Sequence, residues 1–211
     1  MVVPSPPFTP GPPMPSGPEM LPPAKDVLRK AALDARKALV RTLSDAERNL
    51  LERRLAEHLT SLCADCRVVG GYAPIGSEIS PLLATEEARA VGSIVAFPAF
   101  DHPAKPFRFR AGDPLLPGPF GLMQPKLSAP VVEPDLVLVP LLAIDGSGTR
   151  LGRGKGHYDR ALSRLRTAGA RLIGVGWPLQ RLTSPIPADA WDVPLHAFAS
   201  PDGVEWFRSR P

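Results

Sequence analysis

Cysteine is scarce in this sequence: it occurs twice in 211 residues. So low a count excludes the small secreted scaffolds that depend on several disulfides. The sequence also lacks an apolar run near the roughly 18 residues that a membrane-spanning helix needs. Its first residues have neither the apolar stretch of a secretory signal nor the arginines of a mitochondrial one. We therefore expect a cytoplasmic protein with no membrane partner.

A block of like charge is absent as well. The 25 Lys and Arg residues and the 21 Asp and Glu residues are mixed along the chain, and the formal net charge is +4. Nucleic-acid-binding proteins usually gather basic residues and aromatics in one patch. No such patch is visible here, so we expect no nucleic-acid partner.

Proline is abundant at the start of the chain, where it occupies 10 of the first 23 residues. Such a segment buries too little apolar surface to offset the entropy lost on ordering. The composition predicts a disordered proline-rich tail over 1–23, with a ligand for a proline-recognition module as the alternative. Residues 24–211 then form a single domain of about 190 residues, which is large enough for one core.

Cys63 and Cys66 form a Cys-x-x-Cys pattern. A zinc site would need a second pair or a histidine doublet, and a redox pair would open a helix. Here the pair follows a helical run over 51–62. We interpret it as two reduced cysteines packed at the end of a helix.

Helices and strands alternate along the rest of the chain. Apolar spacing predicts a first helix over 25–39, and its expected buried face carries Leu28, Ala31, Ala32, Ala35 and Leu39. Ser44 and Glu47 form a capping box that begins a second helix.

Further along, strands are expected over 67–73, 93–97, 136–144 and 172–176. Helices are expected over 81–91 and from Tyr158, and an edge strand or hairpin around 107–109. This order predicts an α/β fold of three layers, α/β/α, with a mostly parallel, Rossmann-like central sheet.

A glycine loop follows the buried run over 136–144. Gly152, Gly154 and Gly156 alternate with Arg153 and Lys155. Glycine lets backbone N–H groups approach an anion closely, and the two cations and the following helix N-terminus add positive charge. The loop differs from the usual P-loop and from the dinucleotide fingerprint. A polyphosphate site is favoured, and a basic surface turn is the alternative.

The stretch from Arg150 to Asp159 resembles the signature of the 5-formyltetrahydrofolate cyclo-ligase family, and the resemblance extends from Lys25 to the C-terminus. It implies the same three-layer fold and a monomeric enzyme that uses ATP and Mg²⁺ to convert 5-formyltetrahydrofolate into 5,10-methenyltetrahydrofolate. The residues implied in ATP binding are Lys25, Arg29, Arg150, Leu151, Gly152, Arg153, Gly154, Lys155, Gly156, His157 and Tyr158. Lys155 and Arg153 are the expected catalytic cations.

Two of these positions carry an alternative interpretation. Lys25 and Arg29 lie four residues apart on one helix face, which taken alone is more typical of a solvated basic face. The family opens with a similar Lys-x-x-x-Arg, and this likeness implies contact with the nucleotide.

His157 stands where many relatives have Tyr or Phe, so we do not expect it to act as a general acid.

The resemblance also implies a folate pocket and a metal site. Glu78 matches a glutamate that holds the pterin, with a position beside a helix N-cap as the alternative. Phe120 matches an aromatic of the pocket loosely, and core packing is an equal alternative. Asp159 and Asp192 match the Mg²⁺ ligands, since Mg²⁺ prefers carboxylate oxygens; Asp159 could instead cap a helix.

Two rival functions share these features. One is a nucleotide-binding module without chemistry, and the other is a sugar-phosphate isomerase of similar fold. The module would not need this set of matched residues, and the isomerase would not need a second carboxylate or an acid for a pterin.

Overall fold

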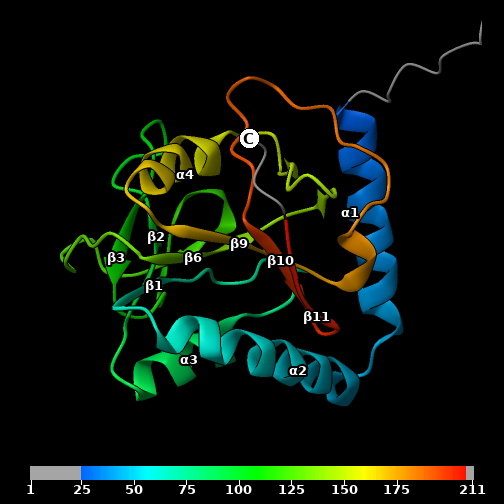
Figure 1. Ribbon diagram of the computed structural model, residues 1–211. Coiled ribbons are helices and arrows are strands. Elements are labelled where there is room, and N and C mark those ends of the chain that lie inside the picture. The colour runs from blue at the N-terminus through cyan, green and yellow to red at the C-terminus, as the bar shows by residue number, and fades with distance from the viewer. Residues whose placement is uncertain (1–24, 208–211) are drawn as a thin grey trace, which may run out of the picture.

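The protein is described by a computed structural model over residues 25–207 (Figure 1). The predicted proline-rich tail over 1–23 lies outside the described residues, as do residues 208–211.

Seven strands form the central sheet. In chain order they are β1 (Val68–Gly70), β2 (Ile94–Ala99), β3 (Arg108–Ala111), β6 (Leu136–Pro140), β9 (Arg171–Val175), β10 (Ala197–Ser200) and β11 (Gly203–Trp206). Across the sheet their order is β11-β10-β9-β6-β1-β2-β3. The five inner strands are parallel, and each edge strand is antiparallel to its neighbour. The prediction of a mostly parallel sheet is therefore confirmed, as is the edge strand around residues 107–109.

Helices cover both faces of this sheet. The helices α2 (Asp45–Ala64) and α3 (Leu82–Ala90) lie on one side, α4 (His157–Thr167) lies on the other, and α1 (Lys25–Thr42) stands beside the sheet (Figure 1). Leu136 and Leu138 pack into the core beneath α2 and α3, whereas Val137 and Val139 pack beneath α4. Side chains alternate between the faces of a strand, so a strand between two helical layers is apolar throughout. The three-layer prediction is confirmed.

The predicted apolar face of α1 is wrong in part. Ala31 and Ala35 are exposed, and the buried residue of this helix is Arg36, at 1% exposure. Its guanidinium is hydrogen-bonded, because Nε donates to Ser77 Oγ (3.0 Å) and Nη1 donates to the carbonyl of Leu141 (3.1 Å). Apolar periodicity places an arginine toward solvent, so it could not anticipate this burial.

The predicted start of α2 is confirmed. The Ser44 hydroxyl accepts from the Glu47 backbone N–H, and the Glu47 carboxylate accepts from the Ser44 backbone N–H. Each partner satisfies an N–H group that the first turn of a helix leaves free.

The buried run over 136–144 is not one strand, which corrects our prediction. β6 ends at Pro140, and β7 (Ala143–Ile144) pairs with β8 (Arg150–Leu151) in a separate antiparallel ribbon. Proline has no N–H for a continuing ladder. The carbonyl of Leu141 accepts from Arg36 and from Gln180 Nε2 (2.7 Å) instead. The glycine loop is thus reached through a ribbon rather than directly from the central sheet.

The smaller elements complete the chain. They are β4 (Leu116–Pro117) with β5 (Met123–Gln124), and the 3-10 turns η1 (Pro119–Gly121) and η2 (Pro178–Gln180). Between residues 25 and 207, no helix is long and apolar enough to cross a bilayer.

The interpretation of Cys63 and Cys66 as two reduced cysteines packed at the end of a helix is confirmed. Cys63 lies in the last turn of α2, Cys66 follows the helix, and both are free and buried. Burial raises the pKa of the Cys63 thiol to about 12, so this thiol stays protonated at neutral pH.

The strand order reverses between β1 and β6. From β1 the chain continues outward to β2, whereas after β6 it continues in the other direction to β9 and β10. Open α/β sheets bind ligands beyond the carboxyl ends of the strands at such a reversal. A ligand site is therefore expected at the carboxyl ends of β1 and β6.

Candidate active site at the ends of β1 and β6

A cavity of about 750 Å³ opens where this reversal occurs. Tyr72 and Ala73, just after β1, and Pro140, the last residue of β6, belong to its lining. All residues predicted from the sequence for the site also line it: Lys25, Arg29, Glu78, Phe120, Asp192 and the whole of 150–159. The fold thus brings together side chains that lie up to 167 positions apart in the chain.

The glycine loop borders the cavity next to the start of α4. Gly154 (φ 83°) and Gly156 (φ 63°) are in the left-handed region, which favours glycine. A Cβ on Gly154 would lie 3.3 Å from Cζ of Arg29, so a side chain there would also crowd α1. Gly156 is the N-cap of α4, and the helix begins at His157, one residue before the predicted start. The free N–H groups of its first turn are at the cavity wall.

Lys25 and Arg29 project from α1 toward this loop. Lys25 Nζ contacts Asp189 Oδ2 (2.5 Å) and Asp192 Oδ2 (2.6 Å), and Arg29 Nε donates to the carbonyl of Gly152 (3.1 Å). Their side chains are 18% and 26% exposed, so they do not form a solvated basic face. Burial opposes the charge on Lys25, but its hydrogen bonds to the two aspartates outweigh it and leave the pKa raised.

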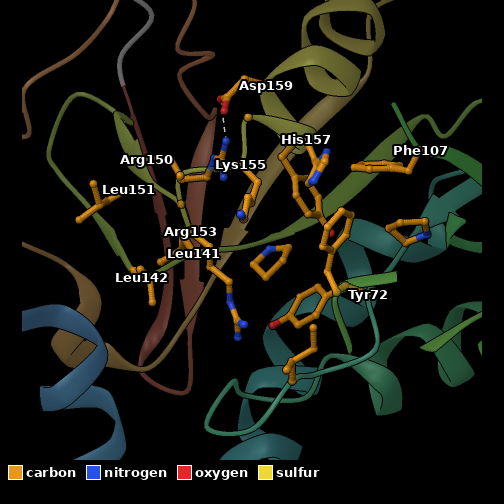
Figure 2. A pocket seen from close by; sticks show the side chains of 18 of the residues that line it. Tyr72, Phe107, Leu141, Leu142, Arg150, Leu151, Arg153, Lys155, His157 and Asp159 are labelled. Carbon is orange, nitrogen blue, oxygen red and sulfur yellow. Dashed lines mark hydrogen bonds and ion pairs between the residues drawn. The ribbon is translucent and has the colours of Figure 1, made fainter. Parts of the chain in front are cut away.

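A second ion pair joins the two ends of the loop. Arg150 Nη2 contacts Asp159 Oδ1 at 2.6 Å, and the guanidinium lies 5.7 Å from the ring centre of Tyr158. Asp159 lies in the first turn of α4, where its charge suits the helix N-terminus, and its carboxylate contacts Arg150. Figure 2 shows this pair, with Lys155 and Arg153 between it and Tyr72 in that view. Among residues 25–207, Lys155 makes no ion pair.

Glu78 reaches the cavity from the loop after β1. Its Oε2 accepts from the Ile75 backbone N–H (2.9 Å), and its Oε1 accepts from Arg153 Nη2 (2.9 Å). The next helix, α3, begins only at Leu82 with Pro81 as N-cap, so Glu78 does not cap it. One predicted phosphate-binding cation and the predicted pterin-binding carboxylate are therefore in direct contact.

Aromatic rings form a further wall. Phe120 and His157 lie 4.8 Å apart between ring centres, and both contact Phe100, at 5.5 Å and 5.0 Å. Phe120 is 52% exposed and has a φ of 62°, so it is a cavity residue rather than part of the core. A left-handed backbone is uncommon for phenylalanine and typical of positions held for function. A flat apolar wall suits an aromatic ring system.

His157 has its two ring nitrogens in different surroundings. Nδ1 faces Arg160 Nη2 at 3.1 Å and so accepts, while Nε2 is buried and has no partner among the described residues. Burial, Arg160 and Lys155 all lower the pKa of His157. A neutral imidazole fits packing against Phe100 and Phe120 better than a general acid would.

This arrangement can be compared with known proteins. A model of the 5-formyltetrahydrofolate cyclo-ligase family matches residues 22–201. The chain belongs to that family. The cyclo-ligase of Mycolicibacterium smegmatis is 33% identical over 193 residues, which cover 86% of this chain and 96% of that protein. The resemblance drawn from the glycine loop is confirmed.

Solved structures agree with the cyclo-ligase assignment. The NMR structure of Aquifex aeolicus 5,10-methenyltetrahydrofolate synthetase is similar with a TM-score of 0.71 and 28% identity, covering 89% of this chain and 94% of that chain. The 5,10-methenyltetrahydrofolate synthetase from Mycoplasma pneumoniae has a TM-score of 0.66 at 24% identity, covering 84% and 98%. At that identity the second likeness supports the fold alone.

The carboxylates that line the cavity of this cyclo-ligase are of the type that would suit a magnesium ion bound together with phosphate groups. Asp159 and Asp192 both face the cavity, and each is ion-paired to a cation that could move to a phosphate. Within residues 25–207 no three Asp, Glu, His or Cys side chains form a ready-made metal cluster. Mg²⁺ commonly binds one or two carboxylates and takes its other ligands from phosphates and water, so a closed protein cluster is not required.

Several cavity residues of the cyclo-ligase were not anticipated. Asp189 shares Lys25 with Asp192, and its backbone N–H donates to Asp192 Oδ2 (2.9 Å). Its position three residues before Asp192 was the available signal. Phe100 follows β2 directly and Tyr72 lies two residues after β1, at the sheet edge where ligands bind, and that placement could have marked them.

Proposed function

We propose that this protein catalyses the cyclisation of 5-formyltetrahydrofolate to 5,10-methenyltetrahydrofolate, with ATP converted to ADP and phosphate. The observation that carries the proposal is the composition of the single cavity at the β1/β6 reversal. A cation-bearing glycine loop lies on one side of it, and a carboxylate with an aromatic wall lies on the other. Two chemically different ligands, a polyphosphate and a flat pterin, suit these two sides.

The nucleotide would bind along the loop. Backbone N–H groups at the left-handed glycines and at the N-terminus of α4 offer hydrogen bonds to phosphate oxygens. Lys25, Arg29 and Arg150 border the same side, and Arg153 and Lys155 reach farther into the cavity. Asp159 and Asp192 would hold Mg²⁺, which neutralises phosphate charge when it is bound.

The folate would place its pterin against Phe100, Phe120 and His157, with its ring N–H and amino donors toward Glu78. A carboxylate accepts two such donors in parallel. Burial of the ring against the aromatic wall supplies the apolar part of the affinity. This pose directs the formyl group on N5 toward the loop that carries Lys155 and Arg153.

The reaction needs activation of a poor electrophile. The formyl carbon is amide-like, so N10 does not displace its oxygen directly. Transfer of the γ-phosphoryl group of ATP to the formyl oxygen releases ADP and turns that oxygen into a leaving group. N10 then attacks the carbon, the ring closes, the N10 proton is lost and inorganic phosphate leaves.

The residues of this chain act in that sequence by positioning and by neutralising charge. Lys155 and Arg153 are placed to stabilise the phosphoryl group as it moves between the two ligands. No protein nucleophile takes part. Exclusion of water by the aromatic wall protects the phosphorylated formyl group from hydrolysis.

The test is an assay of the purified protein with 5-formyltetrahydrofolate, ATP and Mg²⁺, followed by the absorbance of the methenyl product. Product should form only when nucleotide and metal are both present, with ADP and phosphate released in step. Product that forms equally well without ATP would contradict the proposal. Binding of ATP without turnover of the folate would instead support a nucleotide-binding module.

A further inference from the structure

Glu78 lies between two arginines that differ in solvent exposure and in distance from its carboxylate. Arg153 comes from the glycine loop, has a side chain that is 48% exposed, and donates to Glu78 Oε1 at 2.9 Å. Arg36 comes from α1, is 1% exposed, and has its Nη2 at 3.9 Å from the same oxygen. The Glu78 side chain itself is 8% exposed. One arginine is therefore free to leave, and the other is fixed.

Arg36 is held in place without using all of its donors. Its Nε and Nη1 donate to Ser77 and Leu141, while Nη2 is buried and has no hydrogen-bond partner among the described residues. A buried donor without a partner is unfavourable, so such groups are rare and call for an explanation. A small movement of the Glu78 carboxylate toward Nη2 would satisfy it.

The segment that carries Glu78 is itself anchored at its backbone. Trp177 Nε1 donates to the Ser77 carbonyl (3.0 Å), Arg48 Nη2 donates to the Glu78 carbonyl (2.9 Å), and Tyr72 OH donates to the Ile79 carbonyl (2.7 Å). Only the Glu78 side chain is left to exchange partners. The mobile part of the arrangement is thus limited to one carboxylate and the loop arginine.

We infer that Arg36 is a positioning residue that receives the Glu78 carboxylate when Arg153 leaves it for the nucleotide. The inference rests on the proposed function, because it assigns phosphate to Arg153 and pterin to Glu78. In the free protein, Arg153 occupies the Glu78 oxygen that would bind the pterin, and Glu78 occupies the Arg153 N–H that would bind phosphate. Either ligand therefore has to break the Glu78–Arg153 pair. Once one ligand has broken it, the second binds without that expense, and the two ligands reinforce each other.

The predicted coupling is measured as the ratio of two dissociation constants. A β,γ-nonhydrolysable ATP analogue with Mg²⁺ is titrated into the full chain with and without saturating 5-formyltetrahydrofolate. In the wild type, folate should tighten analogue binding by about 5- to 150-fold, the usual range of allosteric coupling. In Arg153→Met the pair is absent, and the ratio should fall to near one. Because Arg153 is half-exposed, this variant tests the coupling without disturbing the core.

Arg36→Met tests the positioning residue. Without Arg36, release of Arg153 leaves Glu78 buried with only the Ile75 N–H, so the analogue alone should bind more weakly than to wild type. Bound folate supplies donors to Glu78 and should restore analogue affinity, which makes the ratio larger. A merely structural defect would weaken analogue binding equally with and without folate, and Arg36→Lys should lie between Met and wild type.

The outcomes separate this inference from the proposed function. If the wild type bound neither ligand, the proposed function would fail. If it bound and converted both, while Arg153→Met kept the wild-type ratio, the coupling through Glu78 would be wrong. If Arg36→Met weakened the analogue equally with and without folate, the role of Arg36 would be wrong.

Discussion

Lys155 is a loop cation of the cavity lining that makes no ion pair among residues 25–207. We therefore expect Lys155→Ala to raise the Michaelis constant for ATP more than that for folate, and Glu78→Ala to do the reverse. A lost charge-assisted hydrogen bond is worth about 1.5–3 kcal/mol, or roughly tenfold to over a hundredfold in affinity. Steady-state kinetics on each substrate measures both effects.

Lys126→Ala is the matched control, because Lys126 is exposed and lies outside the cavity lining. It should leave both constants unchanged. Loss of ATP binding with intact folate binding in Glu78→Ala would show that the two sides of the cavity are assigned the wrong way round.

Asp145 supports the turn before the glycine loop. Its Oδ1 accepts from the backbone N–H groups of Ser147 and Thr149, and its Oδ2 accepts from that of Ile186. Burial opposes ionisation, but these hydrogen bonds outweigh it and lower the pKa of Asp145 below its ordinary 3.8. The resulting stability is complete above about pH 4 and is lost as the pH falls through the folded pKa.

Asp145→Asn should therefore lower the free energy of unfolding at pH 7 by about 1–3 kcal/mol. The difference from wild type should shrink at a pH below the folded pKa, where the wild-type carboxyl becomes protonated. Urea unfolding at the two pH values measures this. A difference of the same size at both would show that the charge of Asp145 contributes nothing.

At the residue scale the sequence predicted the glycine loop and several residues that hold it, such as Arg29, but it missed Arg36 and Asp189. Gly154 and Lys155 are adjacent in the chain and carry a recognisable pattern. Arg36 and Asp189 act through partners more than a hundred positions away, at Leu141 and Lys25. Contacts of that separation are fixed by the fold, and the local signal was limited to the position of Asp189 three residues before Asp192.

At the scale of elements, the glycine loop requires a left-handed backbone at Gly154 and Gly156. Gly154→Ala places a side chain at a φ of 83° and within 3.3 Å of Arg29. The left-handed conformation is unfavourable for alanine by about 1–2 kcal/mol, and the contact should also displace Arg29 from the loop. We expect both a lower melting temperature and weaker binding of ATP, measured by thermal unfolding and titration calorimetry.

Gly112→Ala is the matched control for that effect. Gly112 has a φ of 103° and an added Cβ meets no atom within 4 Å. Its stability should fall similarly, while ATP affinity should not change. Equal ATP affinity in the two variants would contradict a role for the loop in nucleotide binding.

Element prediction succeeded where one pattern dominated. The alternating helices and strands gave the parallel sheet and both helical layers. β10 and β11 were missed, since each has only four residues; β10 follows an irregular segment after η2, and only two residues separate β11 from β10. The β7–β8 ribbon was missed because an apolar run does not show that the strand ends at Pro140. Beyond that residue, the side chains of Arg36 and Gln180 donate to the carbonyl of Leu141.

For the whole molecule, we expect removal of residues 1–22 to leave folding and catalysis nearly unchanged. The family match begins at residue 22, and α1 begins at Lys25. A truncated chain should retain its melting temperature within about 1 °C, since a loss of 1 kcal/mol shifts a domain of this size by about 2–4 °C. Thermal unfolding and the methenyl assay measure both properties. A large fall in either would assign a structural or catalytic role to the proline-rich segment.

The ion pairs around the cavity also determine the electrostatic field that an approaching ligand meets. Its lining contains five Lys or Arg residues and four Asp or Glu residues, so nearly all of the positive charge is cancelled before any ligand arrives. Long-range attraction depends on net charge, and salt screens it beyond about 10 Å at 0.1 M. Anionic ligands should therefore enter by ordinary diffusion, with association rates in stopped-flow measurements that change little with added salt. Lys155 makes no ion pair among residues 25–207, whereas Lys25, Arg150 and Arg153 become available only at contact range, as a ligand replaces the carboxylates that they contact.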